Sequence, residues 1–322
     1  MTAAARPLVV VTRRIASAVE LELAAEFETR LNPSDTPMSA DALKEVMRTA
    51  DAMLPCVADK ITAEIINTPG RKVKLIANYG VGFNNIDIAA AKAAGVAVSN
   101  TPEVLTEATA DLAMTLLLMA ARRAGEGERH VRNGQWTGWR PTHMMGTMVT
   151  GKTLGLVGFG RIARAVTKKA RDGFGMKVVF HDPLVAAGAL GAEARPTLEQ
   201  VLGESDFVSL HCPALPETRH LMNAGRLRQM KKSAMLINTA RGDVVDEAAL
   251  VAALQQGIIA GAGLDVYERE PAIAAELLKM ENVVLLPHLG SATLETREAM
   301  GRRALENIRL FFSGAPLRDR VV

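Results

Sequence analysis

Short runs of apolar residues alternate with longer alanine-rich stretches along the chain. In the first hundred residues, such runs predict strands over 8–11, 75–78 and 96–99. A second series predicts six strands, over 153–157, 177–180, 207–211, 235–238, 262–265 and 283–286. Continuous apolar runs are typical of parallel strands buried on both faces, and helix-length segments separate them. The pattern predicts an α/β protein with two Rossmann-like or flavodoxin-like domains, each built on a doubly wound parallel sheet.

A break in this pattern separates the two domains. Asn100, Thr101 and Pro102 interrupt the strands, and Thr106 and Thr109 then follow with the spacing of a capping box at the start of a helix. The amphipathic segment 293–312 comes after the last predicted strand, so we expect it to return to the first domain. The predicted domains are residues 1–100 plus 291–322, which are discontinuous, and residues 101–290.

The connection before the second series is unusually long. About thirty residues separate the apolar helix over 112–121 from the strand at 153, whereas most connections are much shorter. It contains both tryptophans, Trp136 and Trp139. Large aromatic side chains favour a packed role, so we expect an arm that embraces another subunit or a border of the active site rather than a mobile insert.

Composition and charge argue against several classes of function. The 322 residues include 38 basic and 35 acidic side chains, with no basic block, which gives no electrostatic footprint for nucleic acid or for an anionic membrane. Cys56 and Cys212 belong to no zinc-binding pattern and cannot form a disulfide framework. The N-terminus lacks a signal sequence, and the apolar stretch 112–121 is about half of a membrane span. We expect a cytoplasmic protein without a metal site.

A glycine-rich turn predicts a nucleotide site. The segment GFGRIA at 158–163 directly follows the strand TLGLV and opens a helical pattern, the context in which a GxGxxG/A match is informative. The first glycine permits a tight turn, the second lets the backbone approach a pyrophosphate, and the helix N-terminus attracts the phosphates. The alternative is a strand-to-helix turn without a ligand. The predicted contacts are Gly158, Phe159, Gly160, Arg161 and Ile162.

An acidic residue after the next strand bears on the choice of cofactor. Asp182 lies 22 residues after Gly160, near the spacing expected for the carboxylate that binds the ribose hydroxyls. Its charge would repel a 2′-phosphate, which favours NAD(H). Arg161, Arg164 and His181 lie nearby in the sequence and keep NADP(H) possible. An ordinary surface aspartate is the other interpretation.

Three side chains follow the ends of predicted strands, at the edge where ligands bind in open α/β sheets. Arg241 can grip a carboxylate, His288 can transfer a proton near neutral pH, and Glu270 can stabilise the imidazolium. Each has an ordinary structural explanation when taken singly. Their position at one edge, beside a nucleotide motif, favours a catalytic group.

Several segments carry a family resemblance. TARGDVVDE, GLDVYEREP, LLPHLGSAT, VGFGRIA and YGVGFNNID resemble the signature segments of the D-isomer-specific 2-hydroxyacid dehydrogenases. Within that family, GQWTGWRP and the chain length are most similar to bacterial glyoxylate/hydroxypyruvate reductases. The resemblance implies reduction of a small 2-keto acid, glyoxylate or hydroxypyruvate, in a cleft between a substrate-binding first domain and an NAD-binding second domain. It also implies a homodimer formed largely through the second domain.

The resemblance further implies residue roles. His288 would be the general acid, Glu270 its partner, and Arg241 the anchor for the substrate's carboxylate and carbonyl, with Arg241 and His288 also near the cofactor. The remaining implied cofactor contacts are Thr109, Thr239, Ala240, Asp265 and Ser291. The remaining implied substrate contacts are Leu54, Tyr79 and the backbone of Val81 and Gly82.

Other functions stay open at this stage. A non-enzymatic, NAD-sensing protein resembling transcriptional corepressors could use the same fold, because fold does not determine function. A phosphoglycerate or D-lactate type of dehydrogenase is a further alternative, although the former often has a C-terminal regulatory domain, for which this sequence has no room. Formate dehydrogenase fits less well, because formate oxidation gives no alkoxide for His288 to protonate.

Overall fold

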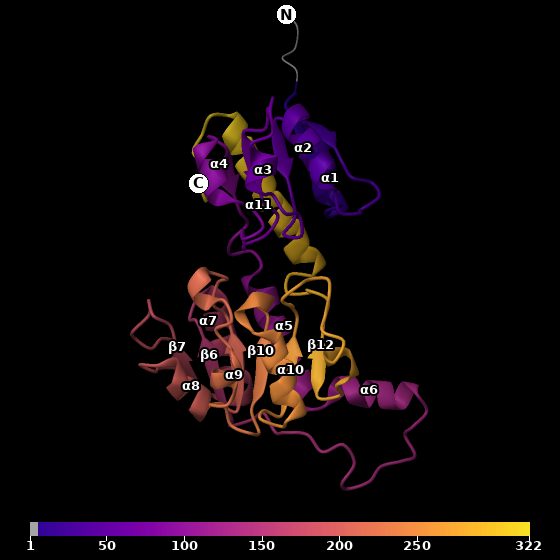
Figure 1. Cartoon of the computed structure of the whole chain (residues 1–322), viewed down its shortest axis with the longest axis vertical. Coiled ribbons are helices and arrows are strands. Elements are labelled where there is room, and N and C mark those ends of the chain that lie inside the picture. Colours follow the sequence, from indigo (N-terminus) through magenta and orange to yellow (C-terminus); the bar gives the residue numbers. More distant parts are fainter. Residues whose placement is uncertain (1–5) are drawn as a thin grey trace, which may run out of the picture. The chain divides into compact units, whose positions relative to one another are not determined.

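The computed structural model describes residues 6–322, which form two compact units (Figure 1). Unit 1 comprises the chain up to Leu105 together with Ser291–Val322, and unit 2 comprises Thr106–Gly290. The chain leaves unit 1 after Leu105. The Thr101 N–H donates to the Gly80 carbonyl, and Leu105 packs against the core of unit 1, so the connecting segment still belongs to it.

Unit 1 contains a five-stranded parallel sheet. Its strands are β1 (Leu8–Val11), β2 (Glu28–Arg30), β3 (Ala52–Leu54), β4 (Leu75–Ala77) and β5 (Ala97–Ser99), in the order β2-β1-β3-β4-β5. This is the flavodoxin-like order. The sequence pattern predicts β1, β4 and β5 but misses the other two. β2 (ETR) is a polar edge strand, and β3 (AML) contains no β-branched or aromatic residue, so neither shows the strand pattern.

Helices cover both faces of this sheet. They are α1 (Ser17–Glu26), α2 (Ala40–Thr49), α3 (Ala63–Ile66), α4 (Ile88–Ala93) and α11 (Leu294–Phe312). α2, α3 and α4 cover one core layer, while α1 and α11 cover the other. α11, yellow in Figure 1, packs against β4 and α1, so the C-terminal segment does return to the N-terminal unit. Thr293 caps its first turn by accepting the Thr296 N–H.

Unit 2 contains a seven-stranded parallel sheet. Its strands are β6 (Thr153–Val157), β7 (Lys177–His181), β8 (Glu193–Ala194), β9 (Phe207–Leu210), β10 (Met235–Asn238), β11 (Gly261–Leu264) and β12 (Val283–Leu285). The order β12-β11-β10-β9-β6-β7-β8 is the Rossmann order with one further strand at the β12 edge. The prediction of six strands is one short, because β8 has only two residues and they are not apolar throughout.

The helices of unit 2 lie on both faces of its sheet. They are α5 (Thr106–Ala121), α6 (Ala124–Arg132), α7 (Arg161–Lys168), α8 (Leu198–Glu204), α9 (Ala224–Leu227) and α10 (Glu247–Gln255). Four shorter turns are η1 (Lys169–Gly173), η2 (Pro216–Thr218), η3 (Gly242–Val244) and η4 (Leu277–Lys279). α5 and α7 pack on one face, and α8, α9 and α10 on the other. Among residues 6–322, the structure contains no helix that is long and apolar enough to cross a membrane.

The parallel arrangement fixes where chemistry can occur. Because all strands of unit 2 run in the same direction, their carboxyl ends meet at one edge of the sheet. The loops that follow β6, β10, β11 and β12 there carry Gly158, Arg241, Glu270 and His288. Glycine at 242 allows the β10 loop to pack closely, since a Cβ at that position would lie 1.9 Å from the Tyr267 carbonyl.

Candidate active site

A histidine and a carboxylate form a pair at this edge. Nδ1 of His288 lies 2.8 Å from Oε2 of Glu270, and the Tyr267 N–H donates to Oε1 of Glu270 at 3.1 Å. Burial alone raises the pKa of Glu270, but the hydrogen bond to His288 and its charge bring that pKa below its usual value. Glu270 is therefore ionised at neutral pH. Nε2 of His288 has no protein partner within residues 6–322, so it is available to a substrate.

The loop that carries His288 is held by Asp265. The Asp265 carboxylate accepts the N–H groups of Leu289 at 2.6 Å and Gly290 at 2.8 Å, and the His288 N–H donates to the Asp265 carbonyl at 2.9 Å. His288 has φ of 57°, a left-handed conformation that is uncommon outside glycine. Burial raises the pKa of Asp265, although the two N–H donors oppose this effect. These bonds compensate the unfavourable backbone conformation of His288.

Arg241 follows β10 in a braced loop. Its Nη1 donates to the Ala240 carbonyl at 2.7 Å, and the Asn238 side chain donates to the Arg241 carbonyl at 2.9 Å. Burial lowers the pKa of the guanidinium from its usual value, while the charges of Glu270 and Asp243 act in the opposite direction. An arginine remains charged at physiological pH in either case. The charge of Glu270 thus acts on both Arg241 and His288.

The glycine-rich loop has the geometry of a phosphate-binding turn. Gly158 has φ of 87°, and Gly160 forms the N-cap of α7, with no atom within 4 Å of a Cβ built on it. Open space at Gly160 allows the backbone to approach a ligand. The side chain of Phe159 is buried and stacks on Phe180 with ring centroids 3.8 Å apart, so only its backbone can face a cofactor. Ile162 likewise packs against the core, whereas Arg161 is exposed.

Asp182 is anchored to this loop. Its Oδ2 accepts the Phe159 N–H at 2.7 Å, and its Oδ1 accepts the Leu184 N–H at 2.8 Å. Each carboxylate oxygen can accept more than one hydrogen bond, so the group keeps capacity for ribose hydroxyls. The carboxylate is held beside the glycine-rich turn, where the adenosine half of a dinucleotide would bind.

The hydroxyl groups of two threonines, Thr109 and Thr239, help to decide whether unit 2 can hold a dinucleotide cofactor. Oγ1 of Thr239, directly after β10, is buried and has no hydrogen-bond partner in the described part of the chain. Oγ1 of Thr109 donates to the Gly290 carbonyl at 3.0 Å. A buried hydroxyl without a partner is uncommon and is consistent with a ligand that supplies one. Ala240 is half-buried beside Thr239, whereas Ser291 belongs to unit 1. The residues of unit 2 therefore fit a dinucleotide.

The residues predicted to contact substrate in unit 1 lie at the carboxyl ends of β3 and β4. Leu54 ends β3, and Tyr79, Val81 and Gly82 follow β4. The carbonyl of Val81 accepts a hydrogen bond from Asn100, and that of Gly82 accepts one from Asn78. The N–H groups of both residues donate to no acceptor within residues 6–322. Such a pair of free donors can bind a carboxylate.

Sequence reasoning missed two features of the site region. A pocket of about 190 Å³ in unit 1 is lined by Leu54 and Tyr79 but also by Arg13, Arg14 and Arg297. These arginines follow a strand or lie on an amphipathic helix, where a solvated charge is the ordinary expectation. His220 and Glu268 form a second histidine–carboxylate pair, 2.9 Å apart. No motif or regular spacing in the sequence indicated the arginines of this pocket or the His220–Glu268 pair.

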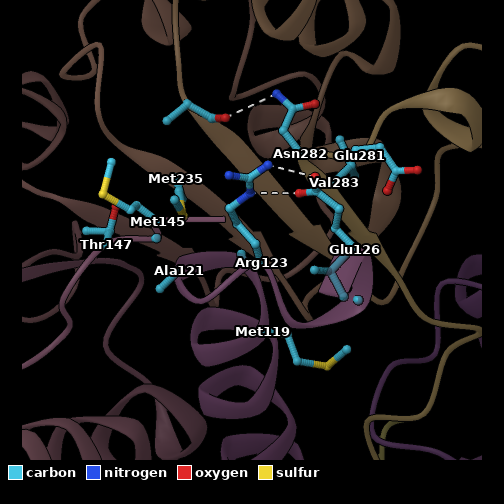
Figure 2. Close-up of a pocket in the computed structure, with 15 residues that line it drawn as sticks. Met119, Ala121, Arg123, Glu126, Met145, Thr147, Met235, Glu281, Asn282 and Val283 are labelled. Carbon is cyan, nitrogen blue, oxygen red and sulfur yellow. Dashed lines mark hydrogen bonds and ion pairs between the residues drawn. The ribbon is translucent and has the colours of Figure 1, made fainter. Parts of the chain in front are cut away.

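A larger pocket of about 430 Å³ lies at the opposite edge of the unit 2 sheet (Figure 2). Met235 and Val283, which begin β10 and β12, line it, and Arg123 and Glu126 form an ion pair within it. None of the predicted site residues lines it. No cluster of residues suited to a metal ion occurs in the part of the chain that the structure describes. The site residues predicted from the sequence therefore lie away from this pocket.

Comparison with known proteins agrees with this geometry. Residues 114–290 match the model of the D-isomer specific 2-hydroxyacid dehydrogenase, NAD binding domain. The chain is 45% identical over 314 residues to a glyoxylate reductase of Korarchaeum cryptofilum, covering 96% of this chain and 94% of the relative. It is 46% identical over 319 residues to a glyoxylate reductase of Thermococcus litoralis, covering 96% and 95%.

A solved structure gives the same result. The NADPH-dependent glyoxylate/hydroxypyruvate reductase of Sinorhizobium meliloti, in complex with NADP and malonate, superposes with a TM-score of 0.88 at 34% identity, covering 99% of this chain and 97% of that one. The likeness extends over both units. The chain therefore belongs to the D-isomer specific 2-hydroxyacid dehydrogenase family and is an NAD(P)-dependent oxidoreductase.

Proposed function

We propose that this protein reduces glyoxylate or hydroxypyruvate to the D-2-hydroxy acid, with NADH as the favoured reductant. The observation that carries the proposal is the His288–Glu270 pair, 2.8 Å apart, with the charge of Arg241 acting on Glu270 at the same sheet edge as the glycine-rich loop. The names of the relatives support the choice of keto acid.

In the proposed mechanism, the protein orients the keto acid and supplies the proton. A bound reduced nicotinamide supplies the hydride to C2. Arg241 binds the substrate's carboxylate and carbonyl oxygen and stabilises the negative charge that builds there. His288 donates the proton on Nε2 to that oxygen, and the ionised Glu270 stabilises the imidazolium and fixes the ring through Nδ1. One hydride and one proton together reduce the carbonyl to the alcohol.

Unit 1 would contribute to substrate binding. We propose that the free N–H groups of Val81 and Gly82 bind the substrate's carboxylate, and that Leu54 and Tyr79 border its side chain. Burial raises the pKa of Tyr79 to about 12, so its hydroxyl stays protonated at physiological pH. The remaining proposed cofactor contacts are Thr109, Thr239, Ala240, Asp265 and Ser291.

We further propose that the protein is a cytoplasmic homodimer. The segment that follows α6 exposes Trp136 by 56% and Trp139 by 82%, together with Met145 and Met148. Large apolar side chains grouped on one segment are typical of an interaction surface, and a second copy of the chain is the partner proposed for this arm. Cys56 and Cys212 are free thiols, which is compatible with a reducing compartment.

Removing the proton donor tests the function. His288→Ala should lower kcat for reduction by about 10² to 10⁴, the range that general acid catalysis supplies, while the Kd for NADH measured by fluorescence stays near that of the wild type. His220→Gln, which alters the other histidine–carboxylate pair, is the matched control and should keep turnover within a few-fold. Wild-type turnover in His288→Ala would refute the assignment, and binding of NADH without reduction of any keto acid by the wild type would favour the NAD-sensing alternative.

Removing the carboxylate partner should change the pH dependence. The pKa of Glu270 lies below its usual value, so the wild-type rate should persist in mild acid and fall only where this carboxyl becomes protonated. Glu270→Gln has no carboxyl to protonate, so its kcat should be lower and should lack this fall in acid. The measurement is kcat for hydroxypyruvate reduction across the pH range at saturating NADH. An unchanged profile would contradict the role of Glu270.

Asp182 should set the cofactor preference. Its carboxylate is held beside the glycine-rich loop and would repel a 2′-phosphate, so we expect a higher kcat/KM with NADH than with NADPH. Asp182→Ser should shift the NADPH/NADH ratio of kcat/KM towards NADPH by about tenfold, equivalent to about 1.4 kcal/mol. A wild-type enzyme that already prefers NADPH by that factor would overturn this interpretation.

A further inference from the structure

The small pocket of unit 1 carries an excess of positive charge. It has a volume of about 190 Å³ and lies where β1, β3 and β4 end, beside the first turn of α11. Three of its lining residues are arginines and one is an acid; the full lining is Arg13, Arg14, Ile15, Asp35, Leu54, Cys56, Tyr79 and Arg297. Two of these residues, Leu54 and Tyr79, are those proposed to border the substrate.

Two of the three arginines are already neutralised. Nε of Arg13 lies 3.0 Å from Oδ1 of Asp35. Arg14 makes two hydrogen bonds of 2.7 Å to the carboxylate of Glu20, which is buried, and this bidentate pair lowers the pKa of Glu20. These carboxylates occupy the guanidinium groups and fix them in place. The charge of each of these two guanidinium groups is therefore balanced by a neighbouring carboxylate.

Arg297 differs from both. No carboxylate within residues 6–322 forms an ion pair with it, although it is half-buried and lines the pocket. Its backbone is held, since its N–H donates to the Thr293 carbonyl at 2.9 Å and its carbonyl accepts the Tyr79 hydroxyl. Its charge acts on the Tyr79 phenol. A guanidinium on a fixed backbone, without a partner in a small pocket, is suited to an oxygen or carboxylate of a ligand.

We propose that Arg297 is a specificity-determining residue that recognises the C3 substituent of the substrate. The inference rests on the proposed function, and it names the substrate class as 2-keto acids with a hydroxyl or a carboxylate at C3. Arg297 donates hydrogen bonds to the C3 oxygen. The Tyr79 oxygen, whose hydrogen is directed to the Arg297 carbonyl, accepts the hydrogen of a C3 hydroxyl. Glyoxylate, which has no C3, and pyruvate, with a C3 methyl, gain nothing from this site.

The test compares four keto acids in four proteins. We would measure kcat/KM for glyoxylate, pyruvate, hydroxypyruvate and 2-oxomalonate with the wild type, Arg297→Met, Arg297→Lys and a control, Arg302→Met. Arg302 lies on the same helix and pairs with Glu22 and Glu298 outside the pocket. Thermal unfolding and circular dichroism would establish that each variant is folded.

The loss should depend on the substrate. Arg297→Met should lower kcat/KM by about 10- to 100-fold for 2-oxomalonate and by up to about tenfold for hydroxypyruvate, the range of charged and weaker hydrogen bonds, with glyoxylate and pyruvate almost unaffected. Arg297→Lys should restore part of the activity on 2-oxomalonate, and Arg302→Met should leave all four values near those of the wild type. An equal loss on all four substrates, or a wild type that does not favour a C3 oxygen over a C3 methyl, would overturn the proposal.

A binding measurement separates this proposal from the proposed function. With NADH present, so that no turnover occurs, calorimetry would compare tartronate, which has a carboxylate at C3, with D-lactate, which has a methyl. Tighter binding of tartronate that is lost in Arg297→Met supports the site even if no keto acid is reduced, in which case only the proposed function falls. Equal binding of the two ligands to the wild type would overturn the site even if glyoxylate is reduced.

Discussion

The candidate active site depends on one buried carboxylate, that of Asp265. It accepts two backbone N–H groups from the loop after β12, and its own carbonyl accepts the N–H of His288. These three hydrogen bonds hold the histidine in a left-handed conformation that its own backbone disfavours. Without them the imidazole would lose its fixed position relative to Glu270, because an exposed loop does not hold such a conformation by itself. Burial of the carboxylate is tolerated because its oxygens are satisfied.

The other candidate site residues of unit 2 are positioned first by the sheet and then by local hydrogen bonds. Parallel strands deliver Gly158, Arg241, Glu270 and His288 to one edge, and each following loop is then fixed by its own hydrogen bonds. Asn238 braces the loop of Arg241, and Asp182 binds the backbone of the glycine-rich turn. The parallel strands thus bring these loops to one edge of the sheet, and polar side chains fix the conformation of each loop. In unit 1, Asn78 and Asn100 likewise hold the carbonyl groups of a turn, whose Val81 and Gly82 N–H groups have no acceptor in the described part of the chain.

Much of this arrangement could be predicted from the sequence. Long apolar runs marked most strands, including β6 and β10, and residues directly after them, such as Arg241 and His288, were assigned to the catalytic edge. The strands β2 and β8 were missed because β2 carries Glu28 and Arg30 and β8 has only two residues, so neither forms an apolar run. Arg297 was missed for a different reason. A helical arginine is ordinarily a solvated charge. Only tertiary structure reveals that Arg13 and Arg14 in the pocket have carboxylate partners, whereas Arg297 has none among residues 6–322.

In the proposed reaction, bound NADH transfers a hydride to one face of C2, and His288 transfers a proton to the carbonyl oxygen. The most direct measurement uses NADH deuterated at the transferable C4 position to reduce hydroxypyruvate, followed by mass spectrometry and chiral chromatography of the product. D-glycerate with deuterium at C2 should be the only product. L-glycerate, a racemic mixture, or glycerate without deuterium at C2 would contradict this reaction.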